Sequence, residues 1–204
     1  MGYASREATN NLMFFSKSLY HIHKLKDHSK NKVKILSKMS GINKLTPNLT
    51  EFDSVTGEER PTKEYTYISN TDWTIQMENP HIDWVEWGFS ERDRERFCRS
   101  IHKRYKYNKF RITESWFNQY SKGSGSDHPF HGHPDISLTN VYFVELKDKS
   151  LGTILVDPKT KKEIRPRVNE GDVLTFPGTV IHKSPPNYTN NRKSVSAFNI
   201  RFLS

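Results

Sequence analysis

Residues 171–182 read Gly171-Asp-Val-Leu-Thr-Phe-Pro-Gly-Thr-Val-Ile-His182, and this stretch decides the fold class. The first glycine supplies a turn, and the apolar run that follows it has the length of a buried strand. The Pro-Gly pair then predicts a second turn, after which comes His182. The pattern indicates a short strand between two tight turns, with a histidine held rigidly at its end.

Short strands separated by turn residues continue on both sides of this stretch. Asp157-Pro158 and Asn169-Glu-Gly171 are two of the turn signals. The expected strands cover residues 110–120, 127–133, 137–146, 151–156, 163–168, 172–177, 180–184 and 193–202. Eight short strands with no helix between them predict a mainly β chain that forms a jelly roll or barrel.

A helix is expected immediately before these strands, over residues 90–107. Ser90 is its expected N-cap, because a serine side chain accepts hydrogen bonds from the first free N–H groups of a helix. Residues 64–68 and 73–77 alternate apolar and polar side chains, as half-buried strands do. We therefore expect one domain over residues 60–204, with the helix packed against a sheet.

The positive charge of the chain is concentrated at its start. Residues 1–50 contain nine basic and two acidic residues and so contribute +7 of the net charge of +9. Apolar residues in this segment recur at helical spacing, which predicts one or two amphipathic N-terminal helices. We expect a solvated basic extension, and a contact with nucleic acid through it is the less favoured alternative.

Three features bear on the compartment. No stretch approaches the roughly 18 apolar residues that a membrane helix needs. The start of the sequence has no apolar run followed by small residues, as a secretory signal would have. The single cysteine, Cys98, excludes an intrachain disulfide and fits a reducing compartment. These features predict a soluble cytoplasmic protein with no membrane partner.

The densest chemical signal is the run His128-Pro-Phe-His131-Gly-His133-Pro-Asp135. Alternate residues of a strand face the same side, so His131, His133 and Asp135 can all point inward. A further ligand from elsewhere in the chain would complete a metal site, and His182 is the candidate. Two histidines and one carboxylate leave open positions on iron(II) for an oxidant and a co-substrate.

Two other metal sites fit part of this pattern. Three histidines would also hold iron, and would suit other oxygen chemistry. A closed structural zinc site is disfavoured, because no cysteine lies near the histidines.

A candidate anion site follows ten residues after His182. Arg192, Ser194 and Ser196 alternate along the last expected strand and therefore share a face. An arginine fork binds a carboxylate through two parallel hydrogen bonds, and a nearby hydroxyl can add a third. The alternative is an ordinary surface salt bridge.

These motifs together resemble a known family, the 2-oxoglutarate/iron(II) oxygenases common in marine bacteria and their phages. The match covers about residues 110–204. The motifs that carry it are Trp116-Phe-Asn118, His131-Gly-His133, Leu138-Thr-Asn-Val-Tyr-Phe-Val144, Gly171-Asp-Val-Leu-Thr-Phe-Pro177, His182 and Arg192-Lys-Ser-Val-Ser-Ala-Phe-Asn199. The resemblance implies a double-stranded β-helix of the prolyl-hydroxylase-like superfamily, a cupin-like jelly roll.

The resemblance leaves the paired metal ligands open. The His-x-His of the family selects His131 and His133, whereas the His-x-Asp of the wider superfamily selects His133 and Asp135. We favour His133, Asp135 and His182 as the metal ligands, with His131 as the alternative. A carboxylate lowers the net charge of the site and so favours oxidation of the iron.

The resemblance also implies the remaining site residues. Arg192 and Ser194 would bind the far carboxylate of 2-oxoglutarate, and Tyr142 would touch the same co-substrate. Asn118 and Asn199 would lie behind these groups. The implied enzyme is an iron(II)- and 2-oxoglutarate-dependent dioxygenase that hydroxylates a protein or a small molecule and releases succinate and carbon dioxide. If the protein is phage-encoded, it would act in the cytoplasm of the host.

Two rival functions use the same residues. A cupin-type metal enzyme would bind a metal through histidines and would be indifferent to 2-oxoglutarate. A non-enzymatic jelly-roll binding or virion protein would have no metal affinity. Metal and 2-oxoglutarate binding therefore separate the three functions.

Overall fold

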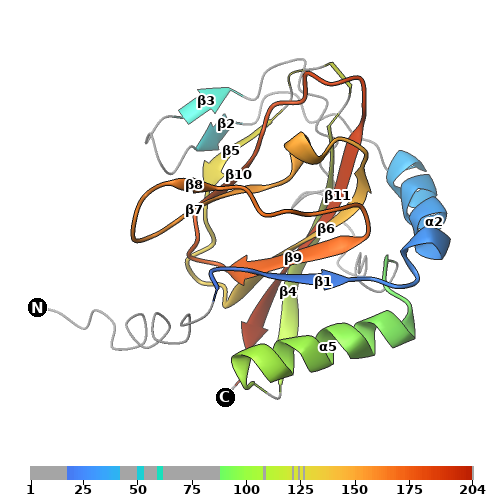
Figure 1. Ribbon diagram of the computed structural model, residues 1–204, viewed down its shortest axis with the longest axis vertical. Helices are drawn as coiled ribbons and strands as arrows, with labels where there is room; N and C mark the ends of the chain where they lie inside the picture. Colours follow the sequence, from blue (N-terminus) through green and yellow to red (C-terminus); the bar gives the residue numbers. More distant parts are fainter. Residues whose placement is uncertain are drawn as a thin grey trace, which may run out of the picture.

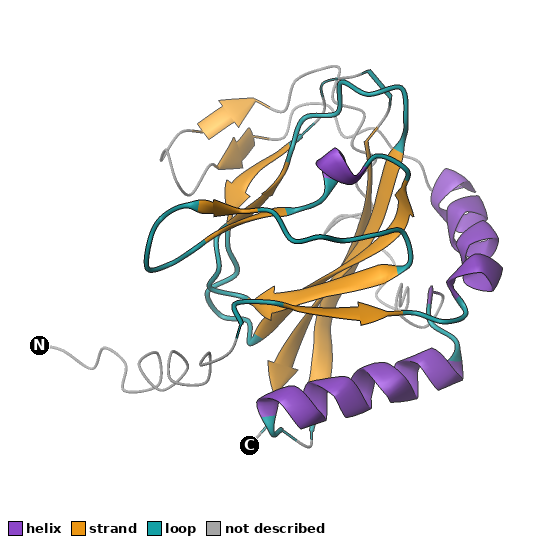
Figure 2. Ribbon diagram, viewed as in Figure 1, coloured by secondary structure: helices purple, strands orange, loops and turns teal. Residues whose placement is uncertain are grey.

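The computed structural model consists of two antiparallel sheets packed face to face, with helices on the outer side of the larger sheet (Figures 1 and 2). The expected strands at 64–68 and 73–77 lie outside the described residues. The structure describes residues 18–41, 50–52, 59–61, 88–107, 109–120, 122–123, 125 and 127–203.

The larger sheet has five strands in the order β1-β9-β6-β11-β4, and all neighbouring pairs are antiparallel. Its C-terminal strand, β11, lies between β6 and β4 rather than at an edge. In sheet order the strands are β1 (His21–Lys24), β9 (Asp172–Pro177), β6 (Leu138–Leu146), β11 (Lys193–Phe202) and β4 (Phe110–Tyr120).

The smaller sheet has four strands in the order β5-β10-β7-β8. Its strands are β5 (His128–His131), β10 (His182–Ser184), β7 (Ile154–Val156) and β8 (Glu163–Ile164). A short 3-10 helix η1 (Lys149–Leu151) precedes β7, and β2 (Thr50–Phe52) pairs with β3 (Glu59–Pro61) as a separate two-stranded sheet. All eight strands expected after residue 109 are present, which confirms the mainly β jelly-roll fold.

Strand alternation divides the core into two layers. Inner-face residues of the larger sheet, such as Val141, Phe143 and Val195, pack against Leu155 and Val180 on the side of the smaller sheet. Outer-face residues pack under the helices instead, and they include Phe117, Tyr142, Phe198 and Ile200. The parity of a residue in a central strand therefore decides whether it points between the sheets or towards the helices.

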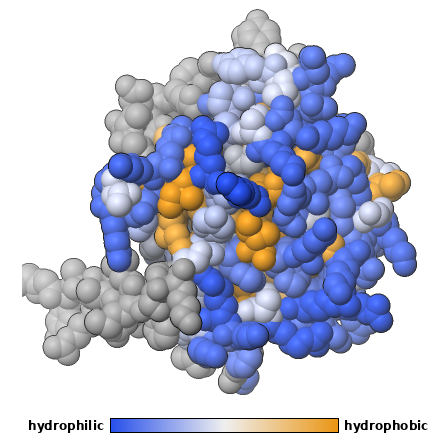
Figure 3. Space-filling view, in the orientation of Figure 1, coloured by the Kyte–Doolittle hydropathy of each residue, from blue (hydrophilic) through white to orange (hydrophobic). Residues whose placement is uncertain are grey.

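Helix α5 (Glu91–Tyr105) covers the outer face, as predicted. Ser90 caps it by accepting a hydrogen bond from the backbone N–H of Asp93. Phe97 and Ile101 lie on its buried side, where their burial removes apolar surface from water. Figure 3 shows hydrophilic side chains over the solvent side of this helix.

The N-terminal segment is more closely integrated than a solvated extension would be. Residues 21–24 form strand β1, which pairs with β9, and helix α2 (His28–Gly41) follows it. The turn between them donates the backbone N–H groups of Lys26 and Asp27 to the buried Asp93 carboxylate, at 3.0 and 2.9 Å. The helix predicted in this segment is observed as α2, whereas the domain boundary near residue 50 stays a prediction.

Within the described part of the chain, neither helix is long and apolar enough to cross a bilayer.

Candidate metal centre

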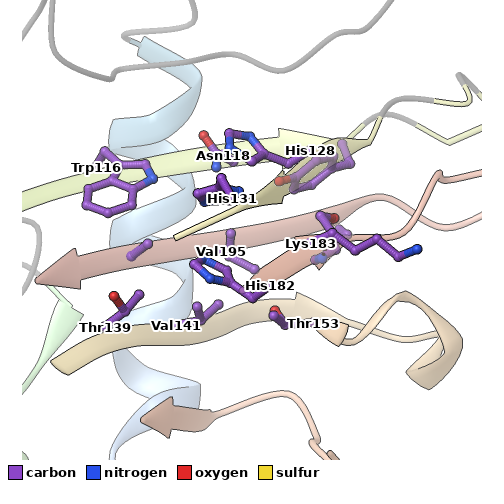
Figure 4. Close-up of a pocket in the computed structure, with 14 residues that line it drawn as sticks. Trp116, Asn118, His128, His131, Thr139, Val141, Thr153, His182, Lys183 and Val195 are labelled. Atoms are coloured by element: carbon purple, nitrogen blue, oxygen red, sulfur yellow. Dashed lines mark hydrogen bonds between the residues drawn. The ribbon is translucent and has the colours of Figure 1, made fainter. Parts of the chain in front are cut away.

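Three histidines converge at the junction of β5 and β10. His131 is the last residue of β5 and pairs with His182, the first residue of β10, while His133 follows two residues after the end of β5. One ring nitrogen from each of the three lies within 4.8 Å of the others. In Figure 4 the rings of His131 and His182 point towards each other across the pocket.

Backbone carbonyls orient two of these rings. Nδ1 of His131 is 2.8 Å from the carbonyl of Pro129, and Nδ1 of His182 is 3.0 Å from the carbonyl of Val180. A carbonyl can only accept, so each Nδ1 carries the proton and each Nε2 keeps its lone pair. This is the arrangement in which a neutral histidine binds a metal through Nε2.

His133 offers the third nitrogen. Its Nε2 is buried and has no hydrogen-bond partner among the described residues. A buried polar atom without a partner is costly, and a metal ion at the centre of the group would satisfy it. The residues present therefore fit a divalent metal.

The turn that carries His133 packs against a glycine of the Pro-Gly pair. The backbone N–H of His133 donates to the carbonyl of Gly178 at 2.7 Å. A Cβ at position 178 would lie 2.4 Å from the carbonyl oxygen of Ile136 and 2.5 Å from that of His133. Only glycine permits this approach, so the Pro-Gly turn predicted before His182 also positions His133.

Burial keeps the imidazoles of His133 and His182 neutral. Burial, with a smaller contribution from the charge of His131, lowers the pKa of His133 to about 4. Burial also lowers the pKa of His182 well below its usual value, and the neighbouring His131 and His133 act in the same direction. Neutral rings can bind a metal near neutral pH without first losing a proton.

Asp135 does not join this group. Strand β5 ends at His131, so the alternation that would turn Asp135 inward does not continue, and Asp135 lies exposed in a turn. The backbone carbonyl of Asp135 accepts a hydrogen bond from Arg201 at 2.7 Å. The structure thus brings together His131, His133 and His182. The ligand set with Asp135 stays a prediction that this geometry does not favour.

A pocket between the sheets runs from the histidines to a buried lysine. The empty space in it amounts to about 410 Å³, a figure that includes open solvent at its mouth. Lys193 is 1% exposed, and its Nζ donates to Ser184 Oγ at 2.8 Å and lies 4.8 Å from the centre of the Tyr120 ring. Burial lowers the pKa of Lys193 to about 7. The lining residues are Trp116, Asn118, Tyr120, His128, His131, Thr139, Val141, Thr153, His182, Lys183, Ser184, Lys193, Val195 and Ala197.

Sequence reasoning missed Lys193 because it placed the anion site one residue away. Arg192 and Ser194 do act together, but both contact Glu145: the guanidinium makes two hydrogen bonds of 2.8 and 3.1 Å, and the hydroxyl makes one of 2.6 Å. Neither lines the pocket. The parity of β11, with Val195 and Ala197 on the pocket side, is the signal that would have selected Lys193.

The three remaining predicted residues have different positions. Tyr142 lies on the outer face, and its hydroxyl is 2.7 Å from Nδ1 of His28, so it does not reach the pocket. Asn118 lines the pocket. Asn199 is buried and contacts Thr139 and Glu114. His128, whose ring centre is 4.2 Å from that of His131, is a further lining residue that had been assigned no role.

Comparison with known proteins finds solved structures with a similar fold. No family model and no curated protein matches the sequence. The structure is similar to AviO1 from Streptomyces viridochromogenes (11% identity, TM-score 0.62, 98% of this chain and 97% of that one). It is also similar to an oxidoreductase of the 2OG-Fe(II) oxygenase family from Burkholderia pseudomallei (11%, TM-score 0.56, 98% and 93%). Viral collagen prolyl hydroxylase from Paramecium Bursaria Chlorella virus-1, solved with 2OG, matches at 10% (TM-score 0.55, 91% and 97%).

At these identities the likeness establishes the fold alone. The chain has the double-stranded β-helix of 2-oxoglutarate/iron(II) oxygenases, with a group of three histidines that can hold a metal.

Proposed function

We propose that this protein is an iron(II)- and 2-oxoglutarate-dependent oxygenase that hydroxylates its substrate and releases succinate and carbon dioxide. One observation carries the proposal: two of the three clustered histidines, His131 and His182, line the same pocket as the buried Lys193. The two groups match the two ends of a co-substrate that chelates a metal through its keto acid and carries a second carboxylate.

His131, His133 and His182 would hold the iron through their ring nitrogens. When bound there with 2-oxoglutarate, iron(II) supplies the activation of molecular oxygen for the oxidation of a C–H bond. The backbone bonds of His131 and His182 keep their rings in the binding orientation, and the turn against Gly178 holds His133. A preformed ligand set reduces the ordering cost of metal binding.

Lys193 and Ser184 would bind the far carboxylate of 2-oxoglutarate. Their side chains already touch at 2.8 Å, so the ammonium and the hydroxyl can donate to the same carboxylate. Both residues are buried, and the adjoining walls include the apolar Val141 and Val195. Exclusion of water strengthens a charge-assisted hydrogen bond at this end of the pocket.

The family, the location, the nucleic-acid contact and the substrate class remain proposals. Membership of the marine bacterial and phage family, a cytoplasmic location and a nucleic-acid contact through residues 1–50 rest on the sequence alone. The substrate class also stays open between a protein and a small molecule. One structural neighbour is a collagen prolyl hydroxylase, which is compatible with a protein substrate here.

The test is an anaerobic titration with iron(II) and 2-oxoglutarate, followed by the visible metal-to-ligand charge-transfer band of the chelate. We expect a band in the wild type and in His102→Ala, a histidine control on the exposed side of α5, but none in His182→Ala. Iron binding without a band would instead indicate a cupin-type enzyme, a function that three histidine ligands also suit. Absence of both would refute the proposal.

A further inference from the structure

The pocket has a second half, beyond the histidines and away from Lys193. Its wall is the inner face of the larger sheet, where Trp116, Thr139 and Ala197 line the pocket. Trp116 is partly exposed, and we call the part of the pocket that it lines the open half. Figure 4 shows Trp116 at one side of the histidines and His128 at the other.

Glu114 lies on the same sheet face, next to the lining residue Trp116, and a relay of buried polar groups fixes its carboxylate. The hydroxyl of Thr139 donates to Oδ1 of Asn199 at 3.0 Å, and Nδ2 of Asn199 donates to the Glu114 carboxylate at 2.7 Å. Asn199 is fully buried, so its amide is held in one orientation. Because Glu114 lies two residues before Trp116 on β4, both side chains are on the inner face.

This carboxylate is not neutralised within the described residues. Among the ion pairs of the described residues, none involves Glu114, although its side chain is only partly exposed. Arg201, two residues beyond Asn199, directs its guanidinium to the backbone carbonyl of Asp135 instead. A fixed carboxylate beside a pocket favours a ligand that brings a positive charge.

Asn118 and Trp116, on the same strand as Glu114, also favour a cationic hydrogen-bond donor as the ligand. Asn118 is 6% exposed, and its Oδ1 has no hydrogen-bond partner in the described structure. An acceptor buried without a partner is expected to receive a donor from a ligand. Trp116 adds an aromatic ring, the side chain that attracts cations most strongly.

We propose that the open half of the pocket binds a cationic nitrogen group of the substrate, an ammonium or a guanidinium. Glu114 forms the ion pair, Trp116 contributes a cation–π contact and Asn118 accepts a hydrogen bond. The inference rests on the proposed function, since it assigns the substrate class of that site.

Binding of matched fragments tests this inference. The protein is loaded anaerobically with iron(II) and 2-oxoglutarate, and its affinity is measured by isothermal titration calorimetry. The probes are N-acetyl-lysinamide and N-acetyl-argininamide, each against a neutral counterpart, N-acetyl-norleucinamide and N-acetyl-citrullinamide. We expect each cationic probe to bind about tenfold more tightly than its neutral counterpart.

The variants identify the source of this preference. Glu114→Gln keeps an oxygen for Asn199 but loses the charge, and Trp116→Leu removes the ring; each should abolish most of the preference. Glu95→Gln, on the exposed side of α5, should retain it. Equal affinities for the paired probes, or a preference that survives in Glu114→Gln, would overturn the inference. The charge-transfer band is recorded on the same samples, so a failure of co-substrate binding is distinguished from a failure of cation binding.

Discussion

The side-chain amine of Lys193 is buried beside a hydroxyl, with no carboxylate partner among the described residues. Such a group is expensive to bury, and a bound dicarboxylate would compensate it. We expect Lys193→Met to weaken 2-oxoglutarate binding by roughly 2 kcal/mol or more, about 30-fold, while iron binding persists. The half-saturation concentration for the charge-transfer band measures the change.

Arg192→Met is the matched control, because it removes a neighbouring cation whose partner is Glu145. Its side chain is 44% exposed, so we expect little change in either co-substrate affinity or stability. A large loss of co-substrate affinity in Arg192→Met with none in Lys193→Met would mean that Arg192, not Lys193, binds the far carboxylate.

The pKa of Lys193 also predicts a proton linkage. Since burial lowers the pKa to about 7, the amine is largely neutral at about pH 8, and a bound carboxylate would raise the pKa again. Binding of 2-oxoglutarate at about pH 8 should therefore take up close to one proton. Calorimetry in buffers of different ionisation enthalpy measures this uptake, which should be absent in Lys193→Met.

The lowered pKa of Lys193 also makes the stability of the ligand-free protein depend on pH. Between about pH 7 and the ordinary lysine pKa of 10.5, the unfolded chain carries this proton and the folded chain does not. The contribution of Lys193 to the free energy of unfolding therefore increases as the pH rises through this window. Denaturant unfolding of the wild type and Lys193→Met at several pH values would compare the two slopes.

At the scale of the element, the turn at residues 133–136 depends on Gly178. We expect Gly178→Ala to push this turn away, to destabilise the fold by about 1–3 kcal/mol and to weaken metal binding by about 10–100-fold. Gly152→Ala is the control, since its Cβ would be 3.0 Å from a side-chain atom of Val168 and would meet no backbone atom closer than 3.3 Å. Unchanged metal affinity in Gly178→Ala would show that the turn does not position His133.

The contact between α5 and the N-terminal segment depends on one carboxylate. Asp93 is fully buried and accepts the backbone N–H groups of Lys26 and Asp27. Asp93→Ala would leave these donors without a partner, and we expect a loss of about 2–4 kcal/mol in the free energy of unfolding. Urea denaturation measures it, and the exposed Glu95→Ala should change by less than about 0.5 kcal/mol.

Local sequence signals predicted those elements that turns delimit. The eight strands after residue 109 and helix α5 are bounded by glycine, proline and capping residues, and all were found. Strand β1 was missed because His21–Lys24 has little strand character of its own and is ordered by pairing with β9, about 150 residues away in sequence.

The site was predicted only in part, because some of its features are local in sequence and others depend on strand pairing. The histidines were identified because they cluster in sequence, whereas the choice between His131 and Asp135 depends on where β5 ends. Lys193 was missed because the alternation of Val195 and Ala197 was not followed back along β11 to residue 193, and the pairing of β11 with β6 and β4 is what turns that face towards the pocket. Tertiary pairing, which a single sequence does not display, decided where β5 ends and which face of β11 lines the pocket.

For the whole molecule, metal binding should appear as thermal stability. A ligand at about 100 times its Kd stabilises the folded state by about 2.7 kcal/mol, which corresponds to roughly 5–10 °C in a chain of this size. We expect manganese(II), a metal that resists oxidation in air, to raise the Tm of the wild type by this amount and to leave His182→Ala unchanged. An equal rise in both proteins would mean that the metal binds elsewhere.

The central position of β11 determines when the protein can fold during its synthesis. β4 and β6 both pair with β11, which is the last described strand to leave the ribosome. At about 5–20 residues per second, β4 waits roughly 5–20 s for this partner. During that interval the nascent chain exposes two unpaired strand edges, which chaperones bind and other chains can capture. We therefore expect the yield of folded protein in cells to depend on translation speed and chaperone supply more strongly than its equilibrium stability would suggest.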